Sequence, residues 1–189
     1  MKNSKISDSS GSWANIALFV ENIWYVANVG DSRAILSMNK GKLVKIMSID
    51  HKPNNEQELN RIMQNGGSVY QTQSGSKNIV NFLIASTVKY GPHRILPGRL
   101  SVSRAFGDIE AKNPDCGGNP NVLIASPDIK SFEITNKTDF LVLGSDGIFE
   151  KLQNEEIIQS IWETQKAETK KSLYNFHEAL GECADMILK

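Results

Sequence analysis

The stretch WANIALFVENIWYVANVGDSRAILSMNKGKLVKIM, residues 13–47, decides the fold. It contains four runs rich in β-branched and aromatic residues, which favour strands. The links between the runs are two to five residues long and contain the Asn, Asp and Gly that are typical of tight turns. Strands joined by such short links pair with their neighbours in antiparallel fashion. We therefore predict an antiparallel meander of four strands: Trp13–Val20, Ile23–Val29, Ala34–Ser37 and Leu43–Met47.

A helix is predicted after Pro53, which interrupts the strand pattern. Asn54 is placed to cap the N-terminus of this helix, and Gln57 three residues later completes a capping box. The helix should bury one apolar face and end at a pair of glycines. The residues concerned are Leu59, Ile62, Met63, Gly66 and Gly67.

The remaining chain alternates short apolar runs with turn residues, which predicts further strands and two more helices. The strands are expected at Val69–Gln73, Arg99–Ser103, Val122–Ala125, Ile129–Ile134 and Asp139–Leu143. One helix should be capped by Asn154 and bury Ile157, Ile158 and Ile161, and the other should span Leu173–Leu188. Residues 1–12 are interpreted as a flexible leader, and residues 74–98 as an insertion loop.

This order of elements, in which hairpins dominate, favours an α+β fold with antiparallel sheets over a doubly wound parallel sheet. Consistent with that, the sequence contains no Gly-rich strand-to-helix loop of the kind that binds nucleotides.

Charge and composition exclude some partners. The 189 residues include 21 Lys plus Arg and 21 Asp plus Glu, so the chain has no global field that would attract nucleic acid or an acidic membrane. No apolar run is long enough to be a signal peptide or to span a bilayer. Cys116 and Cys183 match no metal-binding spacing and are expected to be free thiols. We expect an intracellular, monomeric protein that binds neither nucleic acid nor membrane.

Three polar clusters follow predicted strands, where loops can present side chains to a ligand. They are Asp50–Pro53, Ser101–Asp108 and Gly144–Glu150. Asp146 is the most informative, because it comes directly after a strongly apolar strand and a carboxylate at the rim of a core needs a cation, hydrogen-bond donors or exposure. An ordinary Asp-Gly turn explains Asp146 equally well, and Asp108 could simply pair with Arg104 or with another nearby basic residue.

If these carboxylates converge, they suit Mg²⁺ or Mn²⁺ better than zinc, because the clusters are rich in oxygen donors and contain no cysteine. Two such ions can hold a bridging water and lower its pKa toward neutrality, which is the chemistry of phosphoester hydrolysis.

The clusters lie within six motifs that occur in the order typical of one family. The chain resembles the metal-dependent, type 2C (PPM-type) protein serine/threonine phosphatases from about Gly11 to Ile158. The motifs are Gly11–Ala14, Tyr25–Ala34, Asp50–Pro53, Arg61-Ile62 with Gly66-Gly67, Leu100–Asp108 and Ser145–Glu150.

The resemblance implies a sandwich of two antiparallel sheets flanked by helices, with two or more Mg²⁺ or Mn²⁺ ions and phosphorylated proteins as substrates. Asp146 matches the family's metal-bridging aspartate. Asp50 matches an aspartate associated with a third metal, and Glu150 stands where many members have another aspartate near that ion. An architectural role is implied for Asp31, Arg33, Arg104, Asp108 and Gly147, with Arg33 paired to a carboxylate.

Some family motifs have no counterpart in this chain. The Asp-Gly-His-Gly segment, the early arginine that binds the substrate phosphate and the final Asp-Asn motif are absent. We therefore expect residues 13–189 to be a partial phosphatase domain, incomplete at both ends. No catalytic residue beyond the metal ligands is assigned. The alternative is an inactive fragment or a pseudophosphatase that acts as a binding or regulatory module.

Overall fold

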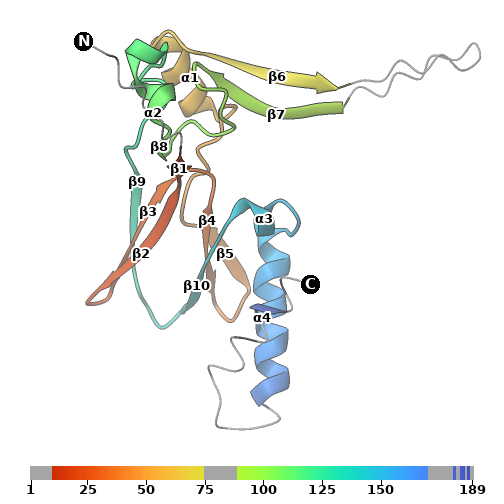
Figure 1. The fold of residues 1–189 in the computed structure, drawn as a ribbon. Helices are drawn as coiled ribbons and strands as arrows, with labels where there is room; N and C mark the ends of the chain where they lie inside the picture. Colours follow the sequence, from red (N-terminus) through yellow and green to blue (C-terminus); the bar gives the residue numbers. More distant parts are fainter. Residues whose placement is uncertain (1–9, 75–88, 170–180, 182–183, 186, 188–189) are drawn as a thin grey trace, which may run out of the picture. The chain divides into compact units, whose positions relative to one another are not determined.

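The structure is a computed structural model that describes residues 10–74 and 89–169 and, near the C-terminus, residues 181, 184, 185 and 187. The chain divides into two compact units. The helix–hairpin unit comprises Met1–Trp13 and His51–Ser126, and the sandwich unit comprises Ala14–Asp50 and Pro127–Lys189. Figure 1 shows the strands and helices of the two units. Each unit has its own hydrophobic core.

The sandwich unit contains two antiparallel sheets of three strands each, with the orders β2–β3–β9 and β10–β4–β5. Together with the flanking helices, these sheets confirm the predicted α+β class. The strands are β2 (Ala14–Val20), β3 (Ile23–Val29), β4 (Arg33–Met38), β5 (Leu43–Ile46), β9 (Asp128–Glu133) and β10 (Thr138–Gly144).

The predicted four-stranded meander is wrong, because β3 and β4 belong to different sheets. The chain crosses from one sheet to the other at Gly30, whose φ of 107° is readily adopted by glycine. The crossing lets the inner faces of the two sheets share one core, which a single flat meander could not provide. That core contains Val26, Ala34, Leu36 and Met47, with Trp24, Met38, Phe132 and Leu141 packed against it.

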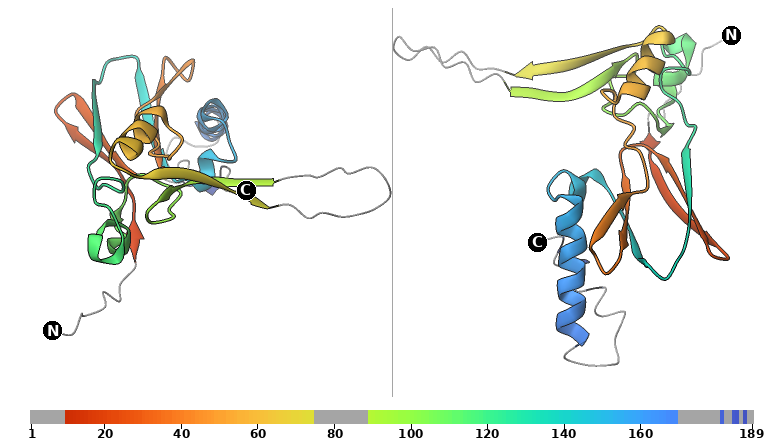
Figure 2. Two further views of the ribbon diagram at one scale, coloured as in Figure 1. Left: turned by 90° about the horizontal axis from the view of Figure 1, so that it is seen from above. Right: turned by 180° about the vertical axis from the view of Figure 1, so that it is seen from behind.

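The opposite face of the β10–β4–β5 sheet is covered by α4 (Asn154–Thr169). Ile157 and Ile158 of the helix are buried against Ile35 of β4, and Ile161 packs at the edge of the same cluster. Seen from behind, α4 runs alongside the β4–β5 hairpin (Figure 2). The apolar face predicted for this helix is therefore confirmed.

The start of α4 differs from the prediction. Asn154 is the first helical residue rather than the cap, and its side-chain oxygen accepts a hydrogen bond from Arg33 Nη1 at 3.0 Å. The carboxylate of Glu156 instead accepts a hydrogen bond from the backbone N–H of Gln153 at 2.7 Å. The Asn154 side chain, which the local pattern predicts as a helix cap, therefore binds Arg33 of β4 instead.

The helix–hairpin unit surrounds a second core. Ile62, Ile95, Val102, Val122 and Leu123 are fully buried in it. Its elements are β1 (Gly11–Ser12), α1 (Glu56–Gln64), β6 (Ser68–Ser74), β7 (Lys89–Leu96), β8 (Phe106–Gly107), α2 (Ile109–Lys112) and the short 3₁₀ helix η1 (Pro114–Cys116).

The predicted helix α1 forms, but two details are wrong. Asn55, not Asn54, is the N-cap, because its side chain accepts the backbone N–H of Gln57 at 3.0 Å. Ile62 is buried and Leu59 half-buried, whereas Met63 is 57% exposed and the charged Glu58 takes a place in the interior. Periodicity could not show this, because it treats a glutamate as a surface residue.

Two predicted strands are absent among the described residues. Arg99–Ser103 and Val122–Ala125 form no strand, and only an isolated parallel bridge joins Arg104 to Ile124. Both stretches are held by side-chain hydrogen bonds instead, in particular from Arg61 to the carbonyls of Val122 and Ser103.

The predicted loop over residues 74–98 is wrong for its second part, because Lys89–Leu96 forms β7 and pairs antiparallel with β6. Residues 75–88 lie outside the described residues. Whether the segment is an insertion relative to the family stays a prediction.

Both ends of the chain are described only in part. Gly11 and Ser12, predicted as leader, form β1 and pair with β8, while residues 1–9 lie outside the described residues. Most of the helix predicted at Leu173–Leu188 also lies outside them. Among the helices that are described, none has the length and apolar character needed to cross a bilayer.

The outer face of the β2–β3–β9 sheet is apolar. Ile16, Leu18 and Ile129 on this face are 57%, 58% and 64% exposed. Ile16 and Ile129 lie in one row across the sheet, because both pair with Ala27. Leu18 lies two residues after Ile16 on β2, on the same face. A patch of this kind is unusual on a monomer that has no partner.

The turn between β4 and β5 has an uncommon backbone. Asn39, Lys40 and Gly41 have φ angles of 55°, 59° and 77°. The carboxylate of Asp139 holds this turn by accepting the backbone N–H groups of Lys40 at 3.1 Å and Gly41 at 3.0 Å. A Cβ on Gly41 would lie 2.5 Å from Cδ1 of Trp162, so the turn packs directly under the indole.

Replacing Gly41 by alanine should destabilise the protein by about 3 kcal/mol, from the positive φ and from the displaced indole together. Gly66→Ala is a matched control, because Gly66 also has a φ of 77° but has nothing within 4 Å of its Cβ position. The control should cost only about 1 kcal/mol. Urea unfolding of both variants measures the difference, and equal losses would contradict the packing argument.

Candidate functional site

Asp146 is the first residue of the short helix α3 (Asp146–Phe149) and follows Ser145 after the mostly half-buried strand β10. The preceding residue, Ser145, has an extended backbone, and its carbonyl accepts the N–H of Ile148 at 3.2 Å. Gly144 must be small here, because a Cβ on it would lie 2.9 Å from the ring of Phe149. Local packing thus fixes how the chain turns from strand to helix and where the half-buried Asp146 sits.

Gly147 is less constrained than the sequence suggested. A Cβ there would meet only the Ser145 hydroxyl at 3.5 Å, an ordinary contact distance. Within the described residues, no steric reason for glycine is found at this position.

Arg33 links the elements around Asp146. It lies opposite Gly144 in the register of β4 and β10, and its guanidinium stacks over Phe149 of α3 at 5.0 Å. Nε and Nη2 donate to the two carboxylate oxygens of Asp50 at 3.1 and 2.6 Å, and Nη1 donates to Asn154 of α4. The hydrogen bond to Asp50 raises the pKa of Arg33 further, against the lowering effect of burial.

This bidentate pair confirms that Arg33 is paired to a carboxylate. It also occupies both oxygens of Asp50, the residue that the resemblance associates with a third metal. Asp50 therefore fits the role of an architectural partner for Arg33 better than the role of a free metal ligand.

Asp31 lies at the crossing between the two sheets and is only 7% exposed. The neighbouring Asn28 holds this crossing: its amide donates to the carbonyls of Gly30 and Ile49 at 3.0 and 2.8 Å. Asn15 of β2 in turn donates to Asn28 Oδ1 at 2.9 Å. The motif around Asp31 therefore forms a hydrogen-bonded corner of the sandwich.

The described residues do not form a complete metal site. Among them, no group of three or more His, Cys, Asp or Glu side chains lies close enough to hold an ion. Asp146 is half-buried and Glu150 is exposed, with its backbone N–H bonded to the Asp146 carbonyl at 2.8 Å. Mg²⁺ loses its waters reluctantly and is held weakly by so few carboxylates. The donors described here therefore do not fit a resident Mg²⁺ or Mn²⁺ by themselves.

A buried charge cluster in the helix–hairpin unit was not predicted. Glu58 of α1 accepts hydrogen bonds from Arg104, Arg61 and the hydroxyl of Ser103 at 2.6, 2.8 and 2.5 Å. The residue that pairs with Arg104 is therefore Glu58 and not Asp108. The spacing of Glu58 and Arg61, three residues apart on one helix, was the available signal, but it is also common on helix surfaces.

The hydrogen bonds around Glu58 favour its ionised form. Burial by itself would raise the pKa of this carboxyl group, but the hydrogen bonds from Arg104, Ser103 and Arg61 outweigh burial and lower the pKa to about 2. The cluster ties α1 to the segments around Ser103 and Val122, because Arg61 also donates to their backbone carbonyls.

Asp108 has an architectural position in the same unit. Its φ is 48°, its backbone N–H donates to the Ser10 carbonyl at 2.8 Å, and its carboxylate lies where a Cβ of Gly11 would otherwise be. Burial raises the pKa of Asp108, and the nearby charge of Lys112 partly opposes this. Position 11 therefore favours glycine, because a larger side chain would overlap the Asp108 carboxylate.

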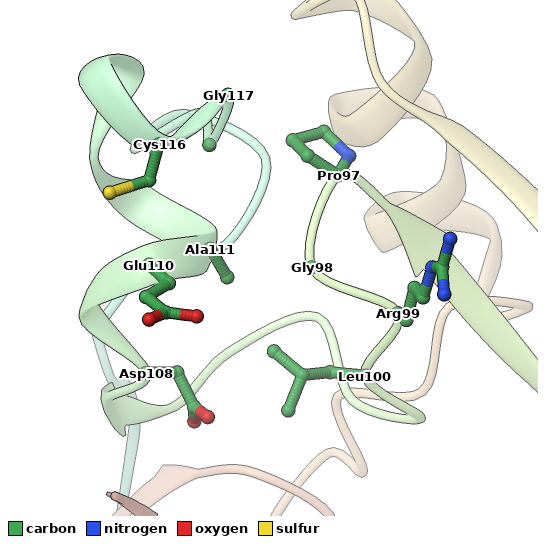
Figure 3. Close-up of a pocket in the computed structure, with 10 residues that line it drawn as sticks. Pro97, Gly98, Arg99, Leu100, Asp108, Glu110, Ala111, Cys116 and Gly117 are labelled. Atoms are coloured by element: carbon green, nitrogen blue, oxygen red, sulfur yellow. The ribbon is translucent and has the colours of Figure 1, made fainter. Parts of the chain in front are cut away.

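A pocket of about 310 Å³ lies beside Asp108, between α2 and η1 on one side and Pro97–Leu100 on the other (Figure 3). Cys116, a free and exposed thiol, is on its rim, while Cys183 lies outside the described residues. The pocket contains neither Asp146 nor Asp50.

Glu58→Gln should lower the free energy of unfolding near neutral pH by about 3 kcal/mol, because two arginines lose their buried counter-charge. The folded pKa of about 2 is below the ordinary value of 4.5, so the carboxylate stabilises the fold above that value. This stability is lost as the pH falls from 4.5 toward 2. Urea unfolding as a function of pH should show this acid loss in the wild type and not in Glu58→Gln. Identical pH profiles would contradict the assignment.

The pair of Arg33 and Asp50 should show an interaction energy of about 2 kcal/mol in a double-mutant cycle. The cycle uses Arg33→Gln, Asp50→Asn and the double variant, with urea unfolding as the measurement. Additive losses would show that the two side chains are neighbours without being coupled.

Comparison with known proteins agrees with this architecture. A family model described as Protein phosphatase 2C matches residues 1–185. The chain is 39% identical to Probable protein phosphatase 2C 4 of Paramecium tetraurelia, over 80% of this chain and 43% of that protein. It is 36% identical to Protein phosphatase 2C homolog 3 of Schizosaccharomyces pombe, over 82% of this chain and 32% of that protein.

Solved structures show the same fold. A serine-threonine phosphatase 2C from Toxoplasma gondii superposes with a TM-score of 0.62 at 20% identity, covering 94% of this chain and 52% of that one. The chain thus spans about half the length of the solved phosphatase and less than half of the two curated relatives. With a family model that matches nearly its whole length, the chain belongs to the protein phosphatase 2C family.

Proposed function

We propose that the protein containing this chain is a metal-dependent protein serine/threonine phosphatase, which removes phosphate from phosphoserine and phosphothreonine in proteins. Membership of the phosphatase 2C family supports this activity. The single observation that carries it within the structure is the position of Asp146. This carboxylate follows the half-buried apolar strand β10, begins α3 and is fixed by the packing of Gly144 against Phe149.

In this proposal Asp146 is the principal ligand that the described residues contribute to a Mg²⁺ or Mn²⁺ centre. Glu150, one helical turn later, is exposed and could approach the same ion. The third-metal role of Asp50 stays a prediction, and its bidentate pairing with Arg33 favours an architectural role. The remaining donors must come from outside the described residues.

The architectural residues have complementary roles. Arg33 holds α3 and α4 against the ends of β4 and β10, while Arg104 and Asp108 organise the helix–hairpin unit. The monomeric state, the absence of nucleic-acid and membrane binding and the intracellular location stay predictions.

The protein that contains this chain should release phosphate from a phosphothreonine peptide in a Mn²⁺-dependent reaction. Asp146→Asn should lower the rate at least about 100-fold, because an electrostatic group at the reacting centre is removed while the shape is kept. Asp115→Asn is the matched control, since Asp115 is exposed and undergoes the same chemical change. Its rate should equal that of the wild type.

If the folded protein that contains this chain shows no Mn²⁺-dependent hydrolysis, the proposed activity is contradicted and the binding-module alternative is favoured. Activity that survives in Asp146→Asn would contradict the assignment of Asp146.

A further inference from the structure

A groove lies between the β4–β5 turn and α4 in the sandwich unit, away from the residues assigned to phosphoester chemistry. It has a volume of about 560 Å³. One wall is the segment from Lys40 to Val44, and the other is the face of α4 that carries Glu155, Trp162 and Lys166. We name it the turn groove.

The turn groove is held by a network of polar contacts that are mostly part-buried. Trp162 Nε1 donates to the Ser37 hydroxyl at 3.2 Å, and this hydroxyl donates to Asp139 at 2.9 Å. The same carboxylate accepts the backbone N–H groups of Lys40 and Gly41. The turn, the strand end and the indole therefore form one preorganised unit, and preorganisation lowers the entropic cost of binding a ligand.

The charges of the turn groove are unevenly placed. Lys40, Lys42 and Lys166 line it, and no ion pair is found for them within the described part of the chain. Of its two carboxylates, Glu163 accepts a hydrogen bond from Gln159 at 2.8 Å. Glu155 is in the first turn of α4, about 16 Å along the helix axis from Lys166. The end of the groove near Gly41 is therefore the basic end.

We propose that the turn groove is a docking site for an extended acidic segment of a partner protein. Alternate side chains of an extended chain point the same way, so acidic residues at alternate positions can meet several lysines. The aliphatic stems of the lysines, together with Leu43 and Trp162, supply apolar contact for the backbone between them. A length of about 16 Å accommodates roughly five extended residues. The acidic residues of the segment lie at the basic end, away from Glu155.

The docking site is remote from the candidate chemical site. Asp139 anchors the turn at the start of β10, and Asp146 follows the other end of this seven-residue strand. At about 3.3 Å per residue, the two ends are about 20 Å apart. A segment bound in the turn groove therefore contributes affinity and partner choice without touching the reacting atoms, whether or not the chain hydrolyses phosphoesters.

Fluorescence anisotropy of the full chain with a labelled peptide carrying glutamate at alternate positions tests the proposal. Binding should weaken roughly tenfold when Lys40→Glu and Lys42→Glu are combined, because two attractive contacts become repulsive. It should also weaken as salt is added. The same peptide with glutamine in place of glutamate should bind at least about tenfold more weakly than the glutamate peptide.

Lys45→Glu is the matched control, because Lys45 is an exposed lysine on β5 that does not line the groove. It should leave peptide binding unchanged. Equal weakening by Lys45→Glu would show general attraction between charges and overturn the site, as would full binding by the Lys40/Lys42 variant. The neutral variant Lys42→Gln, with circular dichroism as a check of folding, separates loss of the charge from loss of the fold. Because binding is measured directly, failure of the docking site and absence of phosphatase activity are distinguishable.

Discussion

The guanidinium of Arg33 is the interaction on which the sandwich unit depends. Its bidentate contact with Asp50, its hydrogen bond to Asn154 and its stacking on Phe149 join the start of β4, the end of α3 and the start of α4 to the segment after β5. A planar group with donors in several directions can satisfy all of these at once, which a lysine cannot. The position of Asp146 follows from this arrangement, because Asp146 begins α3, whose last residue Phe149 packs against the Arg33 guanidinium.

In the helix–hairpin unit, the buried carboxylate of Glu58 connects the surrounding segments. Glu58 is nearly inaccessible to solvent, and three donors compensate the loss of its hydration. A buried charge with all its partners is tolerated, whereas one that loses a partner is costly. Such a cluster selects one arrangement of the surrounding segments, since few other packings would satisfy all its members. This explains why two stretches expected to be strands adopt irregular backbone around it.

The two ends of β10 serve different purposes in the proposals made above. Asp146 follows the C-terminal end of the strand. At the N-terminal end, Asp139 stabilises the turn that carries Lys40 and Lys42. A rigid strand between them keeps chemistry and partner recognition apart. The exposed apolar face of the β2–β3–β9 sheet is a further distinctive surface, but nothing in the described residues indicates what covers it.

The sequence by itself determined the family, the antiparallel α+β class and most strand positions in the sandwich, and it predicted roles for Asp146 and Arg33. These follow from local patterns: β-branched runs, turn residues and motifs of fixed spacing. Only the tertiary structure decided that β3 and β4 lie in different sheets, that Glu58 is the partner of Arg104, and that Asn154 binds Arg33 rather than capping a helix. Each of these depends on contacts between residues far apart in the chain. Local propensity cannot determine them, because the free energy of burying apolar faces and pairing charges depends on the whole packing.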